Sequence, residues 1–181
     1  DGRPGHASYA PCTVEALRAK GYAYWALGHV HQREIVSRAP EQPWIVFPGN
    51  LQGRHARETG GKGATLVTVE HGRVVDVAHR DLDVVRWSRL EIDLTGQDRP
   101  DDVLARIADA LAEALAQADG RMLAARIVVG GSTRAHDALV RDPERWIHDV
   151  RSLANDLGEP GVWLERLDIT TRSRRELEAL R

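Results

Sequence analysis

The sequence lacks most features that mark secreted or membrane-embedded proteins. Its 181 residues contain one cysteine, Cys12, which excludes an internal disulfide and a zinc site built from clustered cysteines. No run of about 18 apolar residues predicts a transmembrane helix, and the first residues lack the basic and apolar regions of a signal peptide. We therefore interpret the chain as soluble and cytoplasmic, with no membrane partner. Any bound metal is expected to use histidine and carboxylate ligands.

A strong excess of charge is also missing. The net charge is −2, so no global basic field indicates nucleic-acid binding, although a local basic groove is compatible with this balance. The two halves nevertheless differ: residues 1–87 carry 11 Arg/Lys against 9 Asp/Glu, and residues 88–181 carry 14 against 18. Six of the eight histidines lie in the first half. With 42% hydrophobic residues, the chain can bury a core.

The first half predicts one short helix and several strands. Thr13 can cap a helix within 11–21, and Gly21 ends it. The apolar strand expected next leads directly into Gly28-His29-Val30-His31, which therefore lies at a strand end or in the loop after it. The remaining expected elements are a strand at 44–47, a turn at 48–50, a long loop at 51–63 and a β-hairpin of 64–70 and 73–79.

The second half predicts a β-α-β-α-β order. Its clearest signal is a helix that opens at Pro100, in which Val103, Ile107 and Leu111 recur at a spacing of four. The other expected elements are strands at 90–94, 123–129 and 162–170, helices at 135–140 and 144–157, and a further helix beginning near 174. Trp146 and Trp163 are expected in the core, and His136 and His148 on the surface.

These patterns predict an α+β protein with two domains. Residues 1–86 are interpreted as the last strands of a β-sandwich, and residues 87–181 as a small separate α+β domain.

The segment Gly28-His29-Val30-His31 is the candidate metal site. Two imidazoles one residue apart can serve two adjacent metal ions, and neutral imidazole binds manganese, iron or zinc. Two such ions could clamp the attacking and leaving oxygens of a phosphodiester. A pair of surface histidines without a metal is the alternative interpretation, and the motif alone does not decide between them.

The loop at 51–63 concentrates positive charge. Arg54, His55, Arg57 and Lys62 are opposed only by Glu58, so the loop could hold backbone phosphates. A solvated loop packed by its own arginines is about as good an interpretation. Two neighbouring amides, Asn50 and Gln52, are candidate polar helpers.

Three linked segments carry a resemblance to a known family. They are residues 9–13 (Tyr-Ala-Pro-Cys-Thr), residues 24–31 around the paired histidines, and residues 47–55, which begin Phe-Pro-Gly-Asn. In combination they resemble the calcineurin-like metallophosphoesterases, and most closely the YhaO-type, SbcD-like DNA repair exonucleases. The resemblance covers roughly residues 5–85. It implies a metallophosphoesterase sandwich in the first domain, and in the second a capping domain that helps admit DNA.

The resemblance also implies roles for single residues. In this family Gly-His-any-His is the last metal-binding motif, so His29 would bind the second metal and His31 the first, and His31 is the expected catalytic residue. The cofactor implied is a pair of divalent ions, predicted as Mn²⁺. The family's earlier ligand motifs do not occur in this sequence, so the chain is expected to be a C-terminal fragment that is inactive alone. His6 is not expected to be a ligand.

The expected partners are DNA and, by the same resemblance, an SMC-like ATPase subunit; an oligomer is compatible with the sequence. Two other functions stay open. One is a non-catalytic module that binds DNA or a partner ATPase, and the other is a phosphodiesterase that acts on small nucleotides. The −4 charge balance of residues 88–181 argues against an extensive phosphate-binding face there.

Overall fold

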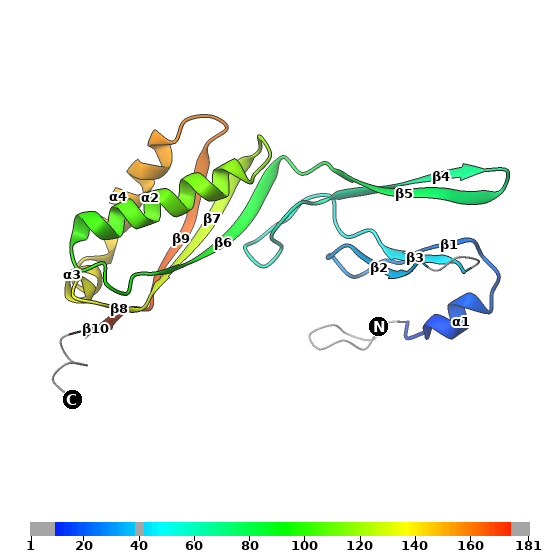
Figure 1. The fold of residues 1–181 in the computed structure, drawn as a ribbon, viewed down its shortest axis with the longest axis horizontal. Coiled ribbons are helices and arrows are strands. Elements are labelled where there is room, and N and C mark those ends of the chain that lie inside the picture. Colours follow the sequence, from blue (N-terminus) through cyan, green and yellow to red (C-terminus); the bar gives the residue numbers. More distant parts are fainter. Residues whose placement is uncertain (1–9, 39–41, 175–181) are drawn as a thin grey trace. The chain divides into compact units, whose positions relative to one another are not determined.

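The computed structural model describes residues 10–38 and 42–174 (Figure 1). The described residues form two compact units. One extends to Leu51 and resumes over Lys62–Leu82, and the other contains Gln52–Gly61 and begins again at Asp83. The loop 52–61 thus packs with the second unit, although the sequence-based limits of 1–86 and 87–181 assigned it to the first. His6 and the helix expected over 174–181 lie outside the described residues, apart from Arg174.

The first unit begins with a short helix and a three-stranded sheet. The helix is α1 (Val14–Arg18), and the Thr13 hydroxyl accepts a hydrogen bond from the Ala16 N–H at 3.1 Å, as expected for its cap. The sheet has the order β1-β3-β2, with β1 parallel and β2 antiparallel to the central strand. Its strands are β1 (Tyr24–Ala26), β2 (Glu34–Ser37) and β3 (Trp44–Phe47). The sequence did not predict β2, because its four residues alternate only weakly.

The predicted hairpin completes this unit. It consists of β4 (Gly63–Glu70) and β5 (Arg73–Asp81), which form a two-stranded antiparallel sheet. Leu66, Val69 and Val75 on this hairpin are more than half exposed. The unit therefore contains two separate small sheets in the described residues, and the specific sandwich expected from the resemblance is not confirmed.

The second unit confirms the predicted β-α-β-α-β order and the α+β class. Its parallel sheet has the order β6-β7-β9. The elements are β6 (Val85–Asp93), α2 (Pro100–Ala116), β7 (Met122–Gly130), β8 (Ser132–Thr133), α3 (His136–Arg141), α4 (Pro143–Asp156), β9 (Val162–Ile169) and β10 (Arg172–Ser173). The short strands β8 and β10 pair with each other and were not predicted.

One face of the parallel sheet carries the main hydrophobic core. Alternate residues of β7, such as Leu123, Ile127 and Val129, pack against Ile107 of α2 and Val150 of α4, and all five are at most 1% exposed. Right-handed crossovers between parallel neighbours place both long helices on this face. A domain with this buried cluster has its own core.

The opposite face of the sheet explains one wrong prediction. Trp163 is in register with Ala124 of β7, which is in turn in register with Trp87 of β6, so both rings lie on the side away from the helices. The two rings meet edge to face with centroids 5.9 Å apart, and Trp163 remains 49% exposed. Trp163 is therefore not a core residue, whereas Trp146 is buried on α4 as predicted.

The two surface histidines expected in the second unit also differ. His148 is exposed, as predicted, but His136 is half-buried. The Nδ1 atom of His136 lies 2.9 Å from the Thr171 hydroxyl. Within the described ranges, no helix has the length and apolar composition needed to cross a membrane.

Candidate functional site

The paired histidines lie in a loop that leaves the end of β1; residues 28–31 are called the histidine loop below. The N–H of Leu27 donates to the Val46 carbonyl at 2.8 Å, so the pairing of β1 with β3 persists one residue beyond the strand. His29 then adopts the left-handed backbone conformation, with φ of 76°. Val30 is buried, whereas His29 and His31 are both exposed. The loop thus anchors itself through its valine and presents an imidazole on either side of it.

The turn after β3 holds this loop in place. The N–H of Asn50 donates to the His31 carbonyl at 3.2 Å. Gly49 has φ of 81°, and a Cβ atom at this position would lie 2.9 Å from the His31 carbonyl oxygen and 3.0 Å from the Arg33 nitrogen. Only glycine permits that approach without a shift of the backbone. The Pro48-Gly49-Asn50 turn is therefore the local reason that the histidine loop is placed where it is.

His29 and His31 are suitable ligands for a divalent transition metal, but two ligands are too few for a closed site. Exposed neutral imidazoles are suitable ligands for such ions. Among residues 10–38 and 42–174, however, no group of three or more His, Cys, Asp or Glu side chains could hold an ion. His29 and His31 can therefore supply two ligands, and a closed site needs others.

Arg33 is a site neighbour that the sequence analysis missed. It follows His31 by two residues, and its charge acts on the hydroxyl of Tyr24 in β1. Burial raises the pKa of Tyr24 above its usual value, and the Arg33 charge offsets part of that increase. Within the described part of the chain, the buried Nε of Arg33 has no hydrogen-bond partner. Its position directly after the Gly-His-any-His segment was the available signal.

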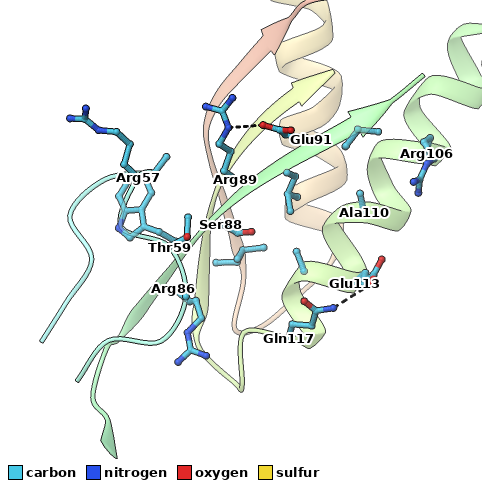
Figure 2. A pocket seen from close by; sticks show the side chains of 17 residues that line it. Arg57, Thr59, Arg86, Ser88, Arg89, Glu91, Arg106, Ala110, Glu113 and Gln117 are labelled. Carbon is cyan, nitrogen blue, oxygen red and sulfur yellow. Dashed lines mark hydrogen bonds and ion pairs between the residues drawn. The ribbon is translucent and has the colours of Figure 1, made fainter. Parts of the chain in front are cut away.

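The basic loop does not form one cluster. The Arg54 guanidinium lies 3.2 Å from the Glu58 carboxylate, which also accepts the Arg54 N–H at 2.9 Å. The His55 ring is 3.7 Å from that carboxylate and accepts the Arg57 N–H. Glu58 is itself buried, so it organises the loop from inside. The Arg57 side chain is exposed at one side of a groove in the second unit (Figure 2).

Lys62 and the two candidate polar helpers have structural partners. Lys62 is buried in the first unit, and its Nζ donates to the Gln32 side chain at 3.2 Å. Gln52 uses its amide to bind backbone, because its Nε2 donates to the Val85 carbonyl at 2.7 Å and its Oε1 accepts the Val84 N–H at 3.0 Å. Asn50 is half-buried and contacts the histidine loop through its backbone. Phosphate binding by these residues stays a prediction.

Comparison with known proteins indicates a relationship for most of this chain. Residues 87–172 match the family model described as the middle domain of metallophosphoesterase YhaO. The chain is also 32% identical over 182 residues to a Bacillus subtilis (strain 168) protein described as uncharacterized metallophosphoesterase YhaO. The alignment covers 99% of this chain and 43% of that relative, so the chain spans less than half of the relative's length. Both similarities support the metallophosphoesterase family.

Proposed function

We propose that this chain contributes part of the active site of a metal-dependent phosphoesterase whose substrate is DNA. The observation that carries the proposal is the loop that exposes His29 and His31 on either side of buried Val30. A hydrogen bond from Asn50 holds the same loop at the His31 carbonyl. The similarity to a metallophosphoesterase supports the same reaction class.

His29 and His31 would hold divalent metal ions, which we propose to be two Mn²⁺. When bound, such ions stabilise the charge of a phosphoryl group and lower the pKa of bound water. We also propose His31 as the catalytic residue, because it would place a metal ion at the reacting phosphate; a histidine that does not bind metal would protonate the leaving oxygen. Because the described residues supply only these two imidazoles, we expect the 181-residue chain alone to bind metal weakly and to be inactive.

Arginines that keep an accessible guanidinium are the best candidates to hold the DNA backbone. Arg57 is exposed, so we propose it as a phosphate contact. Arg33 follows the histidine loop, but it is only partly exposed and its Nε is buried, so it is the weaker candidate. His55, with a 44% exposed side chain, is a third candidate. Arg54 and Lys62 would first have to leave Glu58 and Gln32, so we expect smaller contributions from them.

The test is Mn²⁺-dependent hydrolysis of linear DNA by the complete natural polypeptide that contains these residues. We expect His29→Gly and His31→Ala each to lower the rate by more than about 100-fold, since a lost ligand costs at least as much as a lost outer-shell partner. His148→Ala on α4 is the matched control and should leave the rate unchanged. An unchanged rate in His31→Ala would contradict the proposal.

The same assay separates the remaining functions. Hydrolysis of a chromogenic phosphodiester without hydrolysis of DNA would indicate a phosphodiesterase for small nucleotides. DNA or ATPase binding without any hydrolysis would indicate a binding module. A role in DNA repair and an SMC-like ATPase partner belong to the proposal through the family resemblance alone, and a cytoplasmic location stays an expectation from the sequence.

A further inference from the structure

The outer edge of β6 is open at Arg89 and Glu91, beyond a contact with the loop 52–61 at Trp87. The Leu94 N–H, just after β6, donates to Gly130 of β7, whereas the Trp87 carbonyl accepts the Gly60 N–H on the side away from β7. Backbone groups alternate in direction along a strand, so those of Arg89 and Glu91 also face away from β7. Among the residues that the structure describes, no backbone hydrogen bond reaches the edge at these two positions. Unpaired edge groups are a template for another strand.

A groove of about 850 Å³ lies beside this edge. Figure 2 shows β6 on one side of it and α2 on the other, with Arg106, Ala110 and Glu113 facing the groove. Ala110 and Ala114 are small and only partly buried, although both pack against the core. Side chains of this size allow a second helix to approach to the usual interaxial distance of about 8–10 Å.

The edge strand is complementary to itself in charge. If a second β6 pairs antiparallel with its centre at Leu90, Arg89 lies opposite the partner's Glu91, and Glu91 lies opposite the partner's Arg89. These are the two residues whose N–H and C=O groups face outward, so each pair exchanges two backbone hydrogen bonds. Opposite charges at directly paired positions add to the stability of the sheet.

Helix α2 carries a second self-complementary pair of charges beside the same groove. In an antiparallel helix pair centred at Ala110, position 106 faces position 114 of the partner, so Arg106 lies within one residue of the partner's Glu113, and Glu113 lies within one residue of the partner's Arg106. Helix α2 contacts both β6 and β7, so it lies inside the edge strand by roughly half of the strand spacing of about 4.8 Å. Across a paired edge, two such helices would be separated by about twice that spacing, which is close to helix-packing distance. The charge pairs of the strand and those of the helix thus lie on opposite faces of the sheet, and both are compatible with one two-fold axis.

The other free edge of the sheet is less suited to pairing. The register between β7 and β9 shifts between Ala125 and Arg126, which places an irregularity beside Glu165 in β9. Irregularities of this kind are a common protection of edge strands. The register between β6 and β7 runs without a shift over nine residues, from Val85 to Asp93. The regular edge is the one beside the groove.

We propose that a second copy of this chain docks at the β6 edge and extends the three-stranded sheet across a two-fold axis through Leu90 and Ala110. Such a contact is isologous, because each copy contributes the same strand and the same helix face. The inference does not depend on the proposed phosphoesterase activity, since it uses residues of the second unit only.

Sedimentation equilibrium of the 181-residue chain tests this dimer, from about 1 to about 300 µM, the range of weak specific association. Arg89→Glu places like charges at both pairs and should raise the dissociation constant by more than about 10-fold. The double variant Arg89→Glu/Glu91→Arg restores opposite charges and should restore the dimer. Arg166→Glu is the matched control and should have no effect. Arg166 forms an ion pair with Asp168 two residues along β9, as Arg89 does with Glu91 along β6.

Hydrogen exchange provides a second measurement that does not depend on substitutions. The amides of Arg89 and Glu91 should become protected as the protein concentration rises, and those of Arg166 and Asp168 should not. The proposal is overturned if the chain stays monomeric throughout the concentration range or if Arg89→Glu does not weaken the dimer. It is also overturned if the double variant does not restore dimer formation, or if Arg166→Glu weakens the dimer as much as Arg89→Glu does.

Discussion

The two units stabilise their elements in different ways. The second unit has a contiguous cluster of buried residues on one face of a parallel sheet. The first has a short three-stranded sheet centred on buried Ile45 and Val46, and a hairpin with exposed apolar side chains. Its histidine loop is placed by single backbone contacts to the turn at 48–50. The candidate site thus depends on local backbone geometry, and the proposed dimer surface depends on a packed scaffold.

The largest effect on the free energy of unfolding is expected at a buried carboxylate of the second unit. The Asp83 carboxylate is fully buried and binds Arg86 with two hydrogen bonds at 3.0 Å, and Arg121 lies 3.1 Å away. Asp83→Ala leaves Arg86 and Arg121, whose side chains are 12% and 18% exposed, without their shared buried partner, so it should lower the free energy of unfolding by about 3 kcal/mol. Asp168→Ala, which removes the partner of a largely exposed arginine, should cost no more than about 1 kcal/mol. Urea denaturation measures both, and equal costs would contradict the contrast.

The same substitution in the two units compares their packing directly. Leu111 of α2 is 0% exposed, and Leu66 of β4 is 52% exposed. Leu111→Ala should lower the free energy of unfolding by about 2–5 kcal/mol, because it opens a cavity. Leu66→Ala should change it by less than about 0.5 kcal/mol. A large cost for Leu66→Ala would show that the hairpin is covered in solution.

A pair of glycines isolates the contact that places the histidine loop. Gly49 and Gly72 both have positive φ, at 81° and 76°, but only Gly49 has backbone atoms within 4 Å of a Cβ position. Gly72→Ala should lower the free energy of unfolding only by the strain of a positive φ at alanine. Gly49→Ala should lower it by about 1–3 kcal/mol more, because its Cβ atom would lie too close to the His31 carbonyl. Chemical shifts of the His31 ring should move in Gly49→Ala alone. Equal costs would show that the loop can shift freely.

The smallest expected effect is a change in pH dependence. The Arg126 guanidinium donates two hydrogen bonds to Glu165 and holds the pKa of that carboxyl below its usual value of 4.5. A depressed folded-state pKa contributes stability above the unfolded pKa, and this contribution is lost as the pH falls through the folded pKa. The midpoint temperature of thermal unfolding (Tm) should therefore decrease as the pH is lowered below about 4.5. Glu165→Gln should flatten that decrease, and an unchanged acid limb would contradict the assignment.

The sequence predicted the second unit better than the first, for a physical reason. Helix α2 carries Val103, Ile107 and Leu111 on one buried face, so its period is visible in the sequence. The prediction for Trp163 was wrong because β9 is covered by helices on one face, and such a strand buries every second residue. The aromatic character of a residue does not specify which face it lies on. Strand β2 was missed because it is short and half-buried.

The sequence predicted which residues form the candidate site, but not which residues they contact. The sequence indicated that His29 and His31 follow a strand, and the structure confirms this location. It did not indicate that Glu58 would bind Arg54, that Lys62 would be buried beside Gln32, or that Gln52 would bind the backbone near Val85. These contacts join residues whose neighbours are set by the fold, and local patterns do not encode them.

The central claim is that His29 and His31 bind divalent metal, and nuclear magnetic resonance of the histidine rings tests it most directly. Substoichiometric Mn²⁺ added to the 181-residue chain should broaden the ring signals of His29 and His31 first, because a paramagnetic ion acts on its own ligands most strongly. The ring signal of His148 should stay sharp. Equal broadening of all ring signals, or sharp His29 and His31 signals after Mn²⁺ is added, would contradict the account.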